Sequence, residues 1–102
     1  MKLDTPAVRK LLPPLYSQEK VADPMVKVKF FNPVGAATWY ITEGSEQDGD
    51  FMMFGLCDLY NDGGEIGYVS MNELKSIKLM GGMMTLERDL HWTPVPLSTV
   101  RK

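Results

Sequence analysis

The fold is decided by the stretch Phe51-Met52-Met53-Phe54-Gly55-Leu56-Cys57, at the middle of the 102-residue chain. Apolar residues occupy both alternating sets of positions, so a strand formed here would be buried on both faces. The stretch is therefore predicted to be the central strand of a sheet. Residues 61–64 (Asn-Asp-Gly-Gly) are typical of a tight hairpin turn, so residues 65–69 are predicted to form a neighbouring antiparallel strand.

The sequence before this stretch predicts a second hairpin. In residues 25–31, valine and phenylalanine alternate with lysine, which is the pattern of a half-buried strand. A turn at residues 32–35 leads to residues 38–42, whose β-branched and aromatic side chains predict the antiparallel partner. The polar residues 43–50 are predicted to be a mobile loop.

Two short helices are predicted outside the strands. The pair Thr5-Pro6 is a typical helix start, and a helix over residues 7–12 must end before the two prolines at 13–14. Ser70 and Glu73 form a capping box that predicts the start of the second helix.

The C-terminal quarter of the chain predicts one further strand. Residues 86–92 alternate again, with Leu86, Leu90 and Trp92 expected to face the interior. The proline-containing residues 93–97 are expected to be extended.

Together these patterns predict the α+β class: one small domain of about five mostly antiparallel strands with two short helices. Residues 1–24 are assigned to the N-terminal helix and a proline-rich connector, residues 25–92 to the sheet with its inserted helix, and residues 93–102 to an extended tail. A chain of this length can bury one modest core.

Composition narrows the class of protein. The chain is 44% hydrophobic and 24% charged with a net charge of −2, as in an ordinary globular protein, and its basic residues form no concentrated patch in sequence. The single cysteine, Cys57, predicts a buried thiol in a reducing compartment. We find no secretory signal and no apolar run long enough to span a bilayer, so a cytoplasmic protein without membrane contact is expected.

Two acidic groups are candidates for metal binding, although the sequence carries no recognised catalytic motif and predicts no cofactor. In the predicted last strand, Glu87, Asp89 and His91 share one face, and all three are metal-ligand types. An exposed polar face of a sheet gives the same alternation. The second group surrounds the predicted 61–64 turn and consists of Asp58, Asp62 and Glu65. Turn chemistry recruits such residues for backbone reasons as well.

Two further groups are candidates for binding a macromolecule. Lys27 and Lys29 share a strand face beside Trp39 and Tyr40, an arrangement that can stack and neutralise single-stranded nucleic acid. Alternation places Trp39 and Tyr40 on opposite faces, so at most one joins the lysines.

The methionine-rich segment around Gly81-Gly82 is the second of these groups. Met80, Met83 and Met84 form an adaptable contact surface or fill the core beneath a loop.

Several segments together resemble a known family. In chain order they are Leu12-Pro13-Pro14-Leu15-Tyr16-Ser17-Gln18-Glu19; Val28-Lys29-Phe30-Phe31 with Trp39-Tyr40-Ile41-Thr42-Glu43; Gly67-Tyr68-Val69-Ser70 with Glu73-Leu74; and Glu87-Arg88-Asp89-Leu90 with Pro94 and Pro96-Leu97-Ser98. The likeness covers nearly the whole chain and is to the domain-of-unknown-function family 2958. The resemblance implies a short bacterial or archaeal protein of the kind often encoded on plasmids and integrative conjugative elements. It assigns no catalytic residue.

The function expected from these observations is a non-enzymatic binding module, an accessory protein of a mobile genetic element that contacts a protein or nucleic acid. The alternative is a metal-dependent hydrolase or nuclease that uses the clustered carboxylates. The sequence leaves the oligomeric state and the identity of a partner open.

Overall fold

The structure is a computed structural model that describes residues 2–101. Its elements are, in chain order, α1 (Pro6–Leu11), β1 (Met25–Val26), β2 (Val28–Phe31), β3 (Thr38–Gln47), β4 (Asp50–Asp58), β5 (Glu65–Ser70), α2 (Met71–Ser76), a 3₁₀ turn (Met80–Gly82), β6 (Glu87–Arg88), β7 (Val95–Pro96) and α3 (Leu97–Val100).

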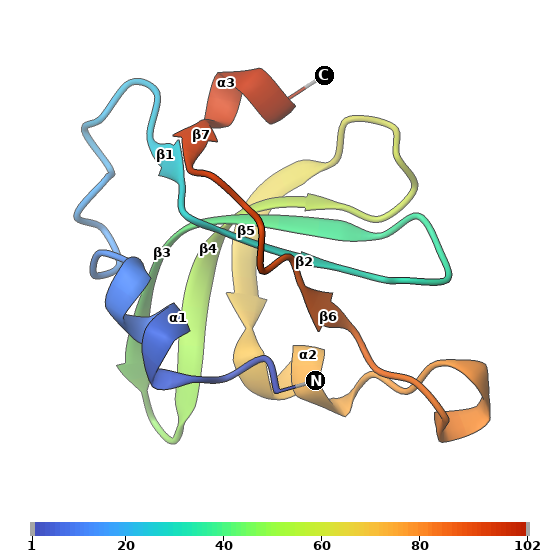
Figure 1. Ribbon diagram of the computed structural model, residues 1–102. Coiled ribbons are helices and arrows are strands. Elements are labelled where there is room, and N and C mark those ends of the chain that lie inside the picture. Colours follow the sequence, from blue (N-terminus) through green and yellow to red (C-terminus); the bar gives the residue numbers. More distant parts are fainter. Residues whose placement is uncertain (1, 102) are drawn as a thin grey trace.

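The main sheet has five strands in the order β5-β4-β3-β2-β6, and each neighbouring pair is antiparallel. A separate two-stranded sheet pairs β1 with β7 (Figure 1). The predicted central strand lies within β4, an interior strand between β3 and β5, but β3 is the middle strand of the five. Met52 and Phe54 of β4 are only half-buried, so its predicted burial on both faces is incomplete. The predicted α+β class, with a mainly antiparallel sheet, is confirmed.

One face of the sheet carries the main hydrophobic core. Its members come from the N-terminal segment, α1, α2, the sheet and the segment before β6: Leu3, Val8, Leu12, Val28, Phe30, Trp39, Ile41, Phe51, Met53, Val69, Met71, Leu74 and Leu86. The two predicted helix caps are confirmed. Thr5 Oγ1 accepts from the Val8 amide at 3.2 Å, and Ser70 Oγ accepts from the Glu73 amide at 3.1 Å.

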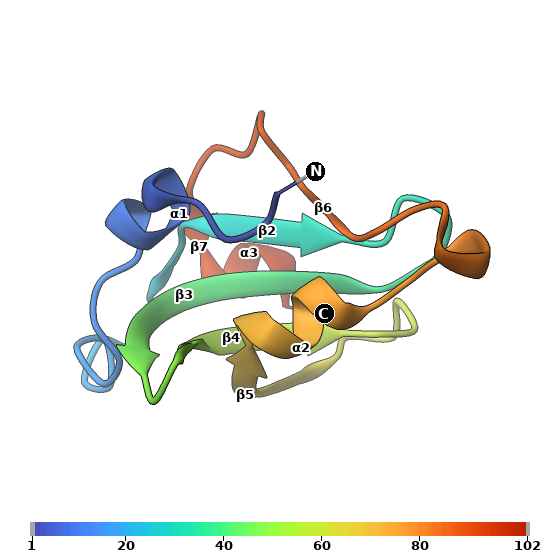
Figure 2. The same ribbon diagram turned by 90° about the horizontal axis from the view of Figure 1, so that it is seen from below.

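The opposite face, called the second face below, is partly covered by the C-terminal segment. Figures 1 and 2 show α2 and α3 on opposite sides of the sheet. The Trp92 indole N–H donates to the Val26 carbonyl at 3.0 Å, and the Leu97 amide donates to the Pro24 carbonyl at 2.9 Å. Residues 93–102 were predicted to be an extended tail, but they include the helix α3. None of the helices in residues 2–101 has the length and apolar composition needed to cross a membrane.

The prediction of a mobile loop over residues 43–50 is wrong. β3 continues to Gln47 and β4 begins at Asp50, so only two residues form the connection. Asp48 and Gly49 have φ angles of 51° and 81°. Two consecutive positive φ angles give the turn whose twist matches the flanking strands of a hairpin. Only residues 46–49 of the segment, at the end of the hairpin, are exposed, whereas Glu43 is buried.

The prediction of a continuous strand over residues 86–92 is also wrong, because only Glu87–Arg88 pair with a neighbour. Asp89 Oδ1 accepts from the His91 amide at 3.0 Å, and the Asp89 carbonyl accepts from the Trp92 amide at 3.3 Å. These bonds form a turn. The turn leaves Leu90 64% exposed, against the predicted inward orientation.

Candidate functional site

A β-bulge in β3 decides what lies on the second face. The register pairs Ile41 with Gly55 and then Glu43 with Phe54, so Thr42 is the extra residue. Strict alternation would place Ile41 and Glu43 on the same face. Because of the bulge, Ile41 enters the main core while Glu43 lies on the second face with Phe54.

Glu43 anchors the connector between α1 and β1. Its side chain is buried, at 5% exposure, and its two carboxylate oxygens accept from the backbone amides of Tyr16 and Gln18, each at 3.0 Å. The neighbouring backbone adds a bond of 2.9 Å from the Gly44 amide to the Pro13 carbonyl. The connector is thus held against β3 by bonds between residues far apart in sequence.

This anchoring places Tyr16 across from β5. Tyr16 has a φ of 70°, a left-handed conformation that is unusual for an aromatic residue and is held by the bonds on either side. The Tyr68 hydroxyl donates to the Tyr16 hydroxyl at 3.2 Å. The Tyr68 ring meets Phe54 edge-on, with ring centroids 5.2 Å apart. Three aromatic rings from the connector, β4 and β5 therefore stand together.

These rings border a pocket of about 300 Å³, called the Tyr16 pocket below. Its lining residues are Tyr16, Gln18, Glu19, Val21, Pro24, Thr42, Glu43, Phe54 and Tyr68. The nine residues, all described by the structure, include two carboxylates and no lysine or arginine. No ion pair to Glu19 or Glu43 forms within residues 2–101.

The electrostatics of the pocket are negative. The pKa of Tyr68 is raised, first by its hydrogen bond with Tyr16, then by burial, and further by the negative charges of Glu43 and Glu19. The backbone amides that bind Glu43 are neutral donors, so they stabilise its carboxylate without cancelling the charge.

The outer edge of β5 runs beside this pocket. Within residues 2–101, β5 pairs with β4 alone. The Ile41 carbonyl accepts from the Lys27 amide at 2.9 Å, so Ile41 directs its backbone groups toward β2. In an antiparallel ladder this direction alternates from residue to residue. Followed through the paired registers, Gly67 bonds toward β4, and the N–H and C=O groups of Ile66 and Tyr68 point outward.

The predicted lysine and aromatic residues are brought together only in part. Trp39 is buried in the main core, whereas Tyr40 faces the second face opposite Lys29. The Lys29 ammonium lies 5.9, 6.0 and 5.4 Å from the ring centroids of Phe31, Tyr40 and Trp92. It also lies 3.9 Å from Asp89 Oδ2. Phe31, Tyr40, Trp92, Lys29 and Asp89 are called the Lys29 cluster below.

Lys27 is half-buried and lines a different hollow, beside the connector. That hollow is also lined by Lys10, so the two basic side chains share it. Lys27 makes no recorded contact with the rings of the Lys29 cluster.

Of the three acidic residues around the 61–64 turn, one closes a loop and two line a hollow. Asp58 is 4% exposed and its carboxylate accepts from the Asp62 amide at 3.1 Å, which closes the loop after β4. Asp62 and Glu65 line a hollow of about 400 Å³ together with Cys57. Burial raises the pKa of the Cys57 thiol, as expected for an unreactive cysteine.

The group of Glu87, Asp89 and His91 is divided by the turn at Asp89. Glu87 pairs with Phe31 in the sheet, Asp89 faces Lys29, and His91 is exposed beyond the turn. In the part of the chain that the structure describes, no three or more His, Cys, Asp or Glu side chains are grouped so that they could hold a metal ion.

The methionine-rich segment projects from the body of the protein in Figures 1 and 2. Met80 and Met83 are 63% and 87% exposed. Met84 is half-buried, and its backbone forms an isolated antiparallel β-bridge with that of Leu79. Met80, Gly81 and Gly82 all have positive φ, so the turn is tight. The segment therefore presents two methionine side chains to solvent.

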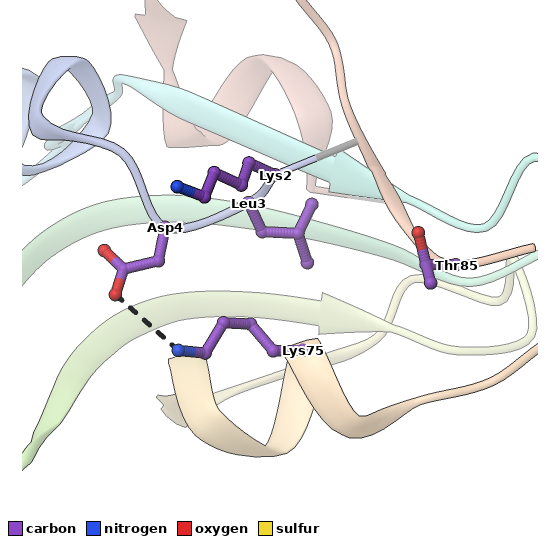
Figure 3. Close-up of a pocket in the computed structure, with 5 residues that line it drawn as sticks. All are labelled: Lys2, Leu3, Asp4, Lys75 and Thr85. Atoms are coloured by element: carbon purple, nitrogen blue, oxygen red, sulfur yellow. Dashed lines mark ion pairs between the residues drawn. The ribbon is translucent and has the colours of Figure 1, made fainter.

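A further hollow lies between the N-terminal segment and α2 (Figure 3). It has a volume of about 410 Å³ and is lined by Lys2, Leu3, Asp4, Lys75 and Thr85. Asp4 Oδ2 lies 3.8 Å from the Lys75 ammonium, and Asp4 also pairs with Arg9 at 2.8 Å. The Arg9 hydrogen bond lowers the pKa of Asp4. Arg9 and Lys75 share this one carboxylate, and Lys2 adds a further positive charge to the lining.

Sequence reasoning missed Tyr16, Glu43 and Tyr68. Tyr16 was assigned to a connector and Glu43 to a loop, and the exposure of Tyr68 on an edge strand has no local signature. The Asp48-Gly49 pair was the one available signal, because such a dipeptide predicts a tight hairpin and would have extended β3 past Glu43.

Comparison with protein-family models identifies the family of the chain. The family model described as "Protein of unknown function (DUF2958)" matches residues 7–100, and the chain belongs to this family. Comparison with curated proteins and with solved structures gave no match.

Proposed function

We propose that this member of the family is a non-enzymatic binding module, a cytoplasmic accessory protein of a mobile genetic element. It binds an extended segment of a protein partner along the outer edge of β5. The observation that carries the proposal is the open edge of β5, six residues long, beside an aromatic pocket on the second face.

The two edges of the main sheet differ in how they are protected. β6 has two residues, and a very short edge strand offers little to pair with. β5 has six residues, none of them lysine or proline, and its register with β4 is continuous without a bulge. β5 therefore has no lysine, proline or bulge to block its edge, and its one charged side chain is that of Glu65, its first residue.

An open edge of this kind selects its ligand by backbone chemistry. The outward N–H and C=O groups of Ile66 and Tyr68 are hydrogen-bonding groups that another extended chain satisfies. Strand addition at a sheet edge is a recurring way of binding a peptide segment, with specificity supplied by pockets for alternate side chains. Tyr68 belongs to both the edge and the Tyr16 pocket.

The ion pair between Lys29 and Asp89 favours a protein over a nucleic acid as the partner. A phosphate-binding lysine needs an ammonium group that is open to a new anion. Lys29 already faces the Asp89 carboxylate, and its side chain is 26% exposed. The protein as a whole has a net charge of −2.

The test is affinity capture with the full chain from a nuclease-treated lysate of the organism that encodes it. Two substitutions at one position isolate the edge. Ile66→Ala shortens the side chain and keeps the outward N–H, and Ile66→Pro removes that N–H as well. Proline is tolerated in edge strands when its nitrogen faces outward.

The proposal requires a protein that wild type and Ile66→Ala retain and that Ile66→Pro loses. Capture that is unaffected by proline, or that disappears on nuclease treatment, would contradict it. Light scattering on the same proteins tests whether a second copy of the chain, and not a different protein, pairs with β5. A dimer that Ile66→Pro converts to a monomer would show that a second copy pairs with β5, and would overturn the partner assignment.

A further inference from the structure

We infer that the Tyr16 pocket binds a cationic side chain, lysine or arginine, of the protein segment that adds to β5. This inference rests on the proposed function and names the chemistry that the partner segment must carry. Four features of the pocket support it: its rings, its charges, its resemblance to a second arrangement in the same chain and its position beside β5.

The rings form an aromatic wall. Tyr16, Phe54 and Tyr68 come from three separate segments and are fixed to one another by the hydroxyl hydrogen bond and the edge-on ring contact. A cation is attracted to the electron-rich face of an aromatic ring, and several rings around one site form the aromatic cages that recognise ammonium groups. Because the rings already contact one another, little ordering is needed when a ligand enters.

The charges give the pocket its sign. Glu43 is buried and bound by neutral amides, so its negative charge acts in a poorly hydrated environment where electrostatic interactions are strong. Glu19 adds a second carboxylate at the rim. Both carboxylates line the pocket together with the Tyr68 ring, and after the Tyr16 hydrogen bond and burial they also raise the pKa of Tyr68. Anions are repelled by this field, and cations are attracted.

The Lys29 cluster shows the complete arrangement within the chain. There an ammonium group lies within 5.4 to 6.0 Å of three ring centroids and 3.9 Å from a carboxylate. The Tyr16 pocket has three rings and two carboxylates, and the cation is not among its nine described lining residues. The same chemistry is satisfied internally at one site and is open to a partner at the other.

The position of the pocket fits a side chain that enters from an added strand. Tyr68 directs its backbone outward and its ring onto the second face, next to Phe54. Side chains of a strand paired with β5 alternate between the two faces. One side of that strand is therefore adjacent to the pocket, and a long flexible cationic side chain can reach it.

The inference is tested by NMR titration of the full chain with N-acetyl-arginine methylamide. The control ligand is the citrulline counterpart, which has nearly the same shape without the charge. The blocked lysine serves as a second cation. We expect saturable shifts of the Tyr16, Phe54 and Tyr68 ring resonances with a Kd of roughly 1 mM for the cations, and roughly tenfold weaker binding of citrulline.

Three variants assign the binding to the pocket. Tyr68→Leu removes a ring and should weaken arginine binding by about tenfold, whereas Tyr68→Phe keeps the ring and should change it by less than about threefold. Glu19→Gln should weaken it by about threefold. Equal binding of arginine and citrulline, shifts confined to other residues, or no saturable shift would overturn the inference.

The two proposals fail separately. A blocked amino acid has too little backbone to form a strand on β5, so its binding does not depend on the outward N–H of Ile66. Failure of the titration removes the cation site and leaves strand addition standing. Capture that is unaffected by Ile66→Pro removes strand addition while the titration result stands.

Discussion

The Lys29 cluster and the Tyr16 pocket lie on the same face of the sheet and are built from the same kinds of residue. Each combines three aromatic rings with carboxylates, one in the Lys29 cluster and two in the Tyr16 pocket. In the Lys29 cluster the cation is supplied by β2 and the site is closed by Trp92, whose indole is bonded to Val26. In the Tyr16 pocket the rings and carboxylates face a hollow of about 300 Å³.

The difference lies in which segment reaches each half of the second face. The C-terminal segment reaches the part of the second face near β1 and β2, where Ser98 donates to Asp23 through its amide at 2.9 Å and its hydroxyl at 2.6 Å. The connector reaches the part near β4 and β5, where it forms a rim. The covered half contributes packing, and the rimmed half forms the pocket that we propose as a recognition site.

The largest expected effect is that of Glu43→Ala on the free energy of unfolding. The substitution leaves the amides of Tyr16 and Gln18 without their acceptor, and a buried unpaired group costs about 1–3 kcal/mol. We expect a loss of about 3 kcal/mol in the free energy of unfolding, because two donors are affected. Urea denaturation measures it. Glu46→Ala is the control on the same strand, since the Glu46 side chain is 73% exposed, and should cost less than about 1 kcal/mol.

A smaller effect is expected from Trp92→Phe in the Lys29 cluster. Phenylalanine keeps a ring beside Tyr40 but loses the indole hydrogen bond to the Val26 carbonyl. The expected loss is about 1 kcal/mol by urea denaturation. An unchanged stability would mean that the C-terminal segment is not held by this bond. Tyr60→Phe, at a 78% exposed position, is the matched conservative change.

Lys29→Met should have a still smaller effect on stability. The ion pair with Asp89 is partly exposed, so its loss is expected to cost less than about 1 kcal/mol. Arginine binding to the Tyr16 pocket should not change, because Lys29 lies outside that pocket. If Lys29→Met created a second arginine site in an NMR titration, the cluster would be shown to accept an external cation once its own is removed.

The smallest expected effect is the response to acid of the hydrogen bonds between Ser98 and Asp23, called the C-terminal clamp below. Hydrogen bonds from the Ser98 hydroxyl and amide lower the pKa of Asp23 below its ordinary value of 3.8. A lowered pKa in the folded state stabilises the protein above the unfolded value, and this contribution is lost as pH falls through the folded pKa. The Ser98 amide resonance should therefore titrate with a midpoint below 3.8. Asp23→Asn should abolish that titration, and a midpoint above 3.8 would contradict the clamp.

The Lys29 side of the second face could be predicted largely from sequence. A strand alternates with a period of two residues, so the sequence predicts that Trp39 and Tyr40 lie on opposite faces, and the structure shows that Tyr40 is the one beside Lys29. Phe31 follows the same alternation. Trp92 was predicted to face inward, and it packs against Tyr40 on this face, although through a turn and not through a strand.

The Tyr16 side could not be predicted in the same way. Its geometry depends on the bulge at Thr42, which reverses the face of Glu43. It also depends on the hydrogen bonds of Glu43 with Tyr16 and Gln18, which precede it by 27 and 25 positions in the sequence. Neither leaves a periodic signal. The polar composition of residues 43–50 was read as a loop, because composition reports exposure and only the Asp48-Gly49 pair reports backbone conformation.

The most direct test of the account compares the two sites in one sample. Wild-type protein is titrated with N-acetyl-arginine methylamide, and the ring resonances of Tyr16 and Tyr68 are followed together with those of Tyr40 and Trp92. We expect the first pair to shift and saturate while the second pair stays fixed, since Lys29 already occupies that cluster. Equal movement of both pairs, or movement of Tyr40 and Trp92 alone, would contradict the assignment of the Tyr16 pocket as the recognition site.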